Sequence, residues 1–197
     1  MPRGFNEHEK DAIRQSLLDV GRAKLISVGM HKTSVEELAR AAHISKGAFY
    51  QFFPSKEALF ITLFAEGERA YRYQLRAFAQ RPGRTPKARL LAFFRDALHC
   101  YRDTPLLSRF SRDDLHALLR TLQPEGMRAS IIDDEVFITE IFNIWRGSGV
   151  KLKCTAMQFS AVLQVLFFTD LDVQDLDDTY AAAVDLILEA LAEKLTA

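Results

Sequence analysis

Residues 33–56, TSVEELARAAHISKGAFYQFFPSK, constrain the fold of this chain more than any other segment. Apolar residues share one helical face of its first part: Val35, Leu38, Ala39 and Ala42. A short turn precedes Ser45, which is a good N-cap for a second helix. Pro54 ends that helix because the residue before a proline avoids the α conformation. Ser55 can then cap a third helix, so the pattern predicts a helix-turn-helix followed by a supporting helix.

Two end signals sharpen this prediction. Thr33 and Glu36 have the spacing of a capping box, in which the hydroxyl accepts the Glu36 N–H and the carboxylate reaches back. Lys56 falls in the first turn of the third helix, where a cation opposes the helix dipole. We therefore expect Lys56 to face an anion, for which a phosphate is the natural candidate.

The second helix carries side chains that suit the major groove of DNA. Gly47 and Ala48 are small enough to let the backbone approach base edges. Lys46 can donate to guanine, Ala48 can touch a thymine methyl, and Gln51 can pair with adenine. Hydroxyls and cations nearby can bind phosphates and set the register. The predicted DNA-binding residues are Thr33, Ser34, Ser45, Lys46, Gly47, Ala48, Tyr50, Gln51 and Lys56.

Two short helices with a turn also occur in all-α proteins that never meet DNA, so the pattern alone leaves both readings open. The motifs together resemble the DNA-binding domain of the TetR family of bacterial transcriptional regulators. They are a first helix from Ile13 to Gly29, the pair Thr33-Ser34, the run Ser45 to Tyr50, and Phe53-Pro54-Ser55-Lys56. The resemblance covers about residues 10–60 in motif detail and the whole chain in length and layout.

The segment departs from the family pattern at two positions. His43 stands where the turn usually has Gly, so a histidine is expected to adopt a positive φ. Phe52 stands where a phosphate-contacting His is often found, and that contact is not transferred to Phe52.

The composition is that of an ordinary soluble globular protein, with 48% hydrophobic and 26% charged residues. No apolar run approaches the ~18–20 residues of a membrane span. The N-terminus lacks the apolar core of a signal peptide, and Cys100 and Cys154 fit no metal-binding spacing. A cytoplasmic protein without a metal or other cofactor is expected.

The formal net charge is zero, which by itself does not favour nucleic acid. Residues 1–60 hold nine Lys and Arg against seven Asp and Glu, a net +2, and residues 61–197 hold 17 against 19, a net −2. This mild asymmetry is compatible with a reader domain that makes few phosphate contacts per subunit.

Helical periodicity dominates the rest of the chain, so the predicted class is all-α. A helix-turn-helix domain is expected over residues 1–54, and a helical effector-binding and dimerisation domain over 55–197. The further helices are predicted at 55–80, 86–102, 111–122, 132–146, 154–169 and 177–195. The acidic segment 170–178 is predicted to be a helix-capping turn rather than a calcium loop.

The helices at about 154–169 and 177–195 are the most apolar. Such a hairpin cannot cover both of its apolar faces alone. In TetR-like proteins the last two helices form a four-helix bundle between two subunits, so the resemblance implies a homodimer. A two-fold dimer would place two recognition helices in successive major grooves.

The chain is rich in aromatic residues, with 15 Phe, five Tyr and one Trp. Each is most simply a core residue, but as a set they favour a pocket for an apolar or aromatic effector. The candidate ligand residues are Phe93, Phe94, Tyr101, Phe110, Phe142, Trp145, Gln164, Phe167 and Phe168. His99, His116 and Arg95 are further candidate polar anchors.

These observations predict a homodimeric, ligand-responsive regulator that binds a palindromic operator on double-stranded DNA, most simply as a repressor. The alternative is a nucleoid or division-linked DNA-binding factor on the same fold without transcriptional duty. An enzyme is not expected, because no nucleophile–base motif or phosphate-binding glycine loop is present.

Overall fold

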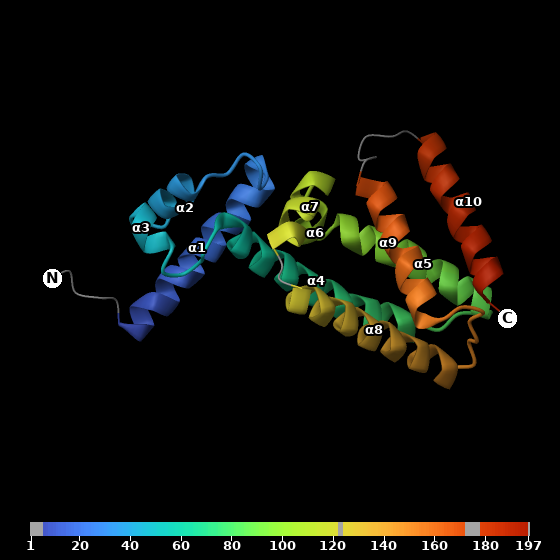
Figure 1. Ribbon diagram of the computed structural model, residues 1–197. Helices are drawn as coiled ribbons and strands as arrows, with labels where there is room; N and C mark the ends of the chain where they lie inside the picture. Colours follow the sequence, from blue (N-terminus) through green and yellow to red (C-terminus); the bar gives the residue numbers. More distant parts are fainter. Residues whose placement is uncertain (1–5, 122–123, 172–177, 197) are drawn as a thin grey trace. The chain divides into compact units, whose positions relative to one another are not determined.

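The computed structural model describes residues 6–121, 124–171 and 178–196. In these ranges the regular elements are helices, with one isolated bridge between Leu152 and Thr196, so the predicted all-α class is confirmed. The helices are α1 (Glu7–Val28), α2 (Val35–Ala41), α3 (Lys46–Phe49), α4 (Lys56–Gln80), α5 (Pro86–Arg102), α6 (Pro105–Ser108), α7 (Arg112–Thr121), α8 (Pro124–Gly147), α9 (Ala156–Leu171) and α10 (Asp178–Leu195) (Figure 1).

The chain forms two compact units that each combine distant segments. The first unit consists of Met1–Glu68 and Pro105–Leu122, and the second of Arg69–Thr104 and Gln123–Ala197. Helix α4 contributes its first half to the first unit and its second half to the second. The domain boundary expected after residue 54 stays a prediction.

Helix α1 begins earlier than predicted, at Glu7 rather than near Ile13. Asn6 caps it, because its side chain accepts the Glu9 N–H at 2.9 Å while the Glu9 carboxylate accepts the Asn6 N–H at 2.8 Å. The helix ends at Gly29, whose φ of 84° is readily adopted only by glycine. The predicted C-terminal end is therefore confirmed.

The predicted capping box of α2 is wrong by one residue. Ser34 is the N-cap, with its hydroxyl accepting the Glu37 N–H at 3.3 Å and the Glu37 carboxylate accepting the Ser34 N–H at 2.9 Å. Thr33 is buried instead and donates its hydroxyl to the Gly29 carbonyl at 2.8 Å. Thr33 thereby ties α2 back to the end of α1.

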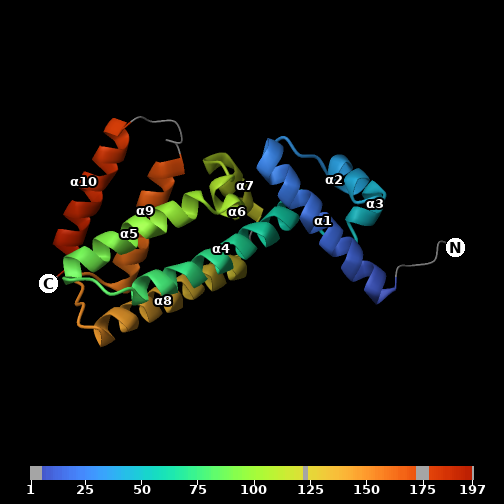
Figure 2. The same cartoon turned by 180° about the vertical axis from the view of Figure 1, so that it is seen from behind.

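In the second unit, α5 packs against α10 and α9, and α9 packs against α8. Figure 2 shows α10 beside α5, and two ion pairs join these helices. Arg95 pairs with Asp185 at 2.9 Å, and Lys87 with Glu193 at 2.7 Å. The turn between α9 and α10 that was expected over residues 170–178 falls largely in 172–177, outside the described residues.

Arginines of α4 join that helix to α8 within the second unit. Arg72 contacts Asp134 at 2.5 Å, and Arg76 binds Glu140 at 2.8 Å. Both guanidinium groups also lie over the Phe137 ring, at 5.6 and 5.0 Å from its centroid. Helix α8 begins at Pro124, eight residues before the predicted start at 132.

Candidate nucleic-acid interface

The turn between α2 and α3 has the geometry that the motif requires. His43 has a φ of 58°, as expected for a position that usually holds glycine. Ser45 then caps α3, because its hydroxyl accepts the Ala48 N–H at 3.1 Å. Phe49 is fully buried and stacks at a tilt against Phe53, with ring centroids 6.0 Å apart. This anchor holds α3 in place and turns its other side outward.

The outward side of α3 presents most of the predicted base-reading residues. Lys46, Gly47 and Gln51 are exposed, and Ala48 is half-buried. A Cβ added at Gly47 would meet only the Ser45 hydroxyl, at 3.9 Å. Packing within the protein therefore leaves room for a side chain at Gly47. Because glycine has none, a base edge could approach the backbone closely at this position.

An ion pair links this face to α2 across the turn. The Lys46 ammonium donates to the Glu36 carboxylate, and both side chains remain more than half exposed. This hydrogen bond lowers the pKa of Glu36 and raises the pKa of Lys46. Sequence reasoning had assigned Glu36 to the cap of α2 and so missed its position beside Lys46. The spacing of ten residues across a helix-turn-helix was the available signal.

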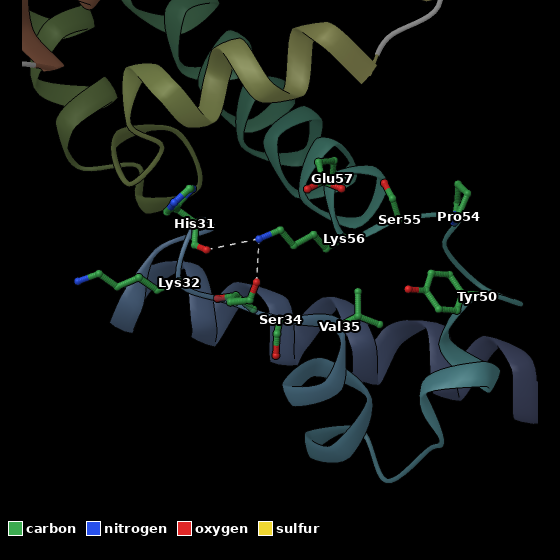
Figure 3. A pocket seen from close by; sticks show the side chains of 10 residues that line it. His31, Lys32, Ser34, Val35, Tyr50, Pro54, Ser55, Lys56 and Glu57 are labelled. Atoms are coloured by element: carbon green, nitrogen blue, oxygen red, sulfur yellow. Dashed lines mark hydrogen bonds between the residues drawn. The ribbon is translucent and has the colours of Figure 1, made fainter.

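The Lys56 ammonium donates to main-chain carbonyl oxygens, those of Thr33 at 2.9 Å and His31 at 3.5 Å (Figure 3) and that of Met30 at 3.2 Å. Its side chain also lines an open groove, and its contact with a phosphate stays a prediction. The chain that leaves α1 presents these carbonyls together, and they supply the negative partner that the helix dipole argument required. Lys56 thus fastens the α1–α2 connection to the start of α4.

A shallow groove of about 520 Å³ gathers several predicted phosphate contacts (Figure 3). Ser34 comes from the start of α2 and Tyr50 from the end of α3, and the groove continues to the Pro54–Glu57 segment. His31 and Lys32 also line it, and both are exposed. Sequence reasoning had not named either residue, although two basic side chains directly before the Thr33-Ser34 pair were visible in the sequence. Phe52 is half-buried.

The predicted ligand residues separate into distinct groups. Phe93, Phe94, Phe142 and Trp145 surround Phe159, with neighbouring ring centroids 4.9–6.3 Å apart. This group is close-packed, and all of it but the half-buried Phe142 is buried.

A second group joins Tyr101 to Phe167, stacked at 4.8 Å, and to the buried Tyr71. Tyr71 donates its hydroxyl to the Ala97 carbonyl at 3.1 Å, and burial raises its pKa well above the ordinary value. Phe110 belongs to the first unit instead, where it contacts Phe64 at 5.4 Å. Gln164 is exposed on α9, and the Phe168 side chain lies outside those described.

The candidate polar anchors do not converge on one cavity. Arg95 is held by Asp185 and Glu189 of α10. His99 lines an open groove of about 450 Å³ between α4 and α5, together with Cys100. His116 is exposed on α7, in the first unit.

No group of three His, Cys, Asp or Glu side chains suited to a metal ion occurs among the described residues. In the same part of the chain, no helix is both long and apolar enough to cross a membrane.

This geometry defines a helix-turn-helix protein with an exposed reading face, and comparison with known proteins agrees. Residues 17–63 match the model of the bacterial regulatory proteins of the tetR family. The chain belongs to the TetR family, whose members regulate transcription by binding DNA.

Two regulators of Escherichia coli align with the chain over roughly two thirds of their own length. The transcriptional repressor NemR of Escherichia coli K12 is 29% identical over 134 residues, which are 64% of this chain and 67% of NemR. The transcriptional regulator RutR of the same strain is 34% identical over 134 residues, which are 67% of this chain and 62% of RutR.

Solved structures share the fold over almost the whole chain. A TetR-family regulator from Pectobacterium atrosepticum has a TM-score of 0.68 at 18% identity, covering 96% of this chain and 94% of its own. FadR of Thermus thermophilus, a TetR-family repressor solved with lauroyl-CoA, has a TM-score of 0.58 at 23% identity, covering 91% and 93%.

Proposed function

We propose that this protein is a homodimeric repressor that reads a palindromic operator through α3 and releases it when a small apolar or aromatic effector binds. The exposed face of α3 carries the proposal, because Lys46, Tyr50 and Gln51 project from a helix whose other side is anchored by buried Phe49. The relative NemR is named as a repressor, which favours repression over activation.

In this proposal, α3 contacts the DNA bases, and the groove beside α3 contacts the DNA phosphates. Lys46 suits guanine, Gln51 suits adenine, and Ala48 suits a thymine methyl. Ser34, Tyr50 and Lys32 line the groove, and in this proposal their hydroxyl and ammonium groups contact phosphates. Lys56 and Thr33 support this surface from within, since their polar groups bond to main-chain carbonyls.

The dimer would form through α9 and α10. Met157 and Val165 of α9 are 67% and 65% exposed, and Leu186 and Ile187 of α10 are 69% and 51% exposed. Met157 and Val165 are eight residues apart and share one face of α9, and Leu186 and Ile187 are neighbours on α10. A second copy of the chain is the occupant that fits, because the same apolar patch on two subunits is self-complementary about a two-fold axis.

The effector would bind in the second unit, beside α4. The smaller cluster of Tyr71, Tyr101 and Phe167 would have to open for the ligand, and its Phe167 ring is half-buried, whereas the Phe93–Trp145 group is more closely filled by its own rings. A ligand can release DNA only by as much as it prefers the conformation that does not bind. FadR of Thermus thermophilus, a repressor of the same family, was solved in complex with lauroyl-CoA, which supports an apolar effector for this chain.

Binding titrations over a panel of duplexes test the reading face. Lys46→Ala should change the order of preference among sequences, while Tyr50→Phe should weaken binding to every duplex by a similar factor. Each lost base contact is expected to cost about 1–3 kcal/mol at its position. The groove assignment is wrong if Lys46→Ala leaves both affinity and preference intact.

A further inference from the structure

The carboxylate of Glu36 stands on the reading face without a role in the fold. The cap of α2 is made by Ser34 and the neighbouring Glu37, which also pairs with Lys24. Glu36 bonds to the Lys46 ammonium instead, and both side chains are exposed. An exposed ion pair contributes only about 0–1 kcal/mol to stability. A negative charge on a DNA-facing surface also repels phosphates, so its presence there needs another reason.

The pair has the donor and acceptor pattern of a G·C reader. In the major groove a G·C pair presents the guanine acceptors O6 and N7 next to the cytosine amino donor. Lys46 offers N–H donors, and Glu36 offers an acceptor within hydrogen-bond reach of that same ammonium. The ammonium can donate to guanine while the carboxylate accepts from cytosine. The two side chains can stay in contact while they do so, because O6 and the amino group are themselves hydrogen-bonded neighbours.

We infer that Glu36 is a specificity-determining residue, which together with Lys46 reads one G·C pair in each half of the operator. This inference rests on the proposed function and adds a residue of α2 to the base contacts of α3. In the major groove only cytosine N4 and adenine N6 donate to a carboxylate, and beside a guanine bound by Lys46 the neighbouring donor is the cytosine amino group. Glu36 therefore favours its cognate site and disfavours all other DNA.

Selection from random duplexes at fixed salt, run in parallel on wild type, Glu36→Gln and Lys46→Gln, tests the inference. Wild type is expected to enrich a G·C pair at one position per half-site, and each variant to lose discrimination at that same position by about 5- to 150-fold. The double variant should lose no more than the larger single loss, because the two residues read one pair. Glu36→Gln should also bind non-cognate DNA more tightly than wild type does.

Two controls separate base reading from charge and from folding. Glu193→Gln removes the same charge from an exposed Glu–Lys pair in the second unit and should leave selection unchanged. Glu37→Ala removes the cap partner of Ser34 and should lower the unfolding temperature, which Glu36→Gln should not.

The outcomes separate the two proposals. If Glu36→Gln tightens binding to all DNA but keeps the base preference of wild type, Glu36 only repels phosphates and the inference is overturned. The same holds if Glu36→Gln and Lys46→Gln alter different positions. If wild type selects no sequence at all, the proposed function fails first.

Discussion

At the scale of single residues, lysines near the reading face differ in what their ammonium groups contact. Lys56 is bound by three main-chain carbonyls, Lys46 by a carboxylate, and Lys32 is exposed beside the groove. Sequence reasoning assigned Lys46 to guanine in the major groove, and Lys56 to a phosphate because a cation in the first turn opposes the helix dipole. It could not see the carbonyls that leave α1, since these converge only once the first unit is folded.

Replacing Lys56 by Met should therefore lower the stability of the fold more than it weakens the attraction to DNA. Loss of the bonds to the Thr33 and Met30 carbonyls is expected to lower the free energy of unfolding by about 1–3 kcal/mol. Lys32→Met should leave stability unchanged and reduce the salt dependence of DNA binding by about one phosphate contact. Chemical denaturation and binding at several salt concentrations measure both. A stable Lys56→Met protein with a reduced salt slope would show that Lys56 faces DNA after all.

Gly67 and Gly47 differ in whether the fold leaves space for a side chain. A Cβ at Gly67 would lie 2.8 Å from the Leu106 Cβ and 3.0 Å from its carbonyl oxygen, whereas Gly47 has open space. Gly67→Ala should destabilise the protein by about 1–3 kcal/mol through overpacking of α4 against α6. Gly47→Ala should leave the unfolding temperature unchanged or slightly raised, yet weaken DNA binding. Equal melting temperatures for the two variants would contradict this distinction.

At the scale of elements, most helices could be predicted, and the errors concern their ends. The helix at 86–102 was predicted correctly because Thr85 and Pro86 mark its start and its apolar spacing is regular. The start of α8 was missed because Pro124 was taken only as a stop, although proline is also favoured in the first turn of a helix. The cap of α2 was misplaced because Thr33-Ser34-Val35-Glu36-Glu37 offers two capping boxes in adjacent registers. Burial of Thr33 against α1, a tertiary contact, decides between them.

The N-cap assigned to Ser34 predicts how two variants of this residue differ in stability. Ser34→Ala should cost about 1 kcal/mol, because the Glu37 N–H loses its acceptor at the start of a short helix. Ser34→Asp should restore most of that stability, since a carboxylate can also cap. Thermal unfolding of the two variants provides the measurement. Full stability of Ser34→Ala would place the cap elsewhere.

The contact of α4 with α8 should respond to pH in two opposite ways. Burial raises the pKa of Asp134 despite the neighbouring Arg72, whereas the hydrogen bond from Arg76 lowers the pKa of Glu140. The Asp134 contribution to stability is thus greatest at low pH and falls as pH rises through its folded pKa. The Glu140 contribution is present above its unfolded pKa and is lost as pH falls through its folded pKa.

Unfolding free energies of Asp134→Asn and Glu140→Gln between about pH 3 and pH 7 test these signs. Relative to wild type, Asp134→Asn should become less destabilising as pH rises, and Glu140→Gln more destabilising. Parallel profiles for the two variants would contradict the assigned environments.

At the scale of the whole molecule, the fold class and the reading face followed from the sequence, but the effector residues did not gather as one site. Aromatic content identifies side chains that seek burial without saying which of them fill the core. Packing decides this: Phe93 and Trp145 contact each other at 4.9 Å in the second unit, while Phe110 belongs to the first. The predicted dimer helices likewise exist as helices, and helical periodicity could not indicate which of their apolar side chains stay exposed.

A charge placed at the exposed apolar residues of α10 should separate the proposed dimer. Leu186→Glu is expected to shift the protein to monomer at micromolar concentration, because a carboxylate would be buried in the contact without a partner. Val136→Glu is the matched control, since Val136 is 64% exposed and Leu186 69%, on different helices of the second unit. Sedimentation velocity measures the outcome. A dimeric Leu186→Glu protein would place the dimer contact on another surface.

The most direct test of the central claim is selection of genomic and random DNA fragments by the purified full-length protein, at fixed near-physiological salt, with sequencing of what is retained. The account predicts a two-fold symmetric site whose half-sites lie about one helical turn apart, roughly 34–36 Å between centres. Retention of DNA without sequence preference, lost as salt is raised, would contradict it and leave the helix-turn-helix as a scaffold.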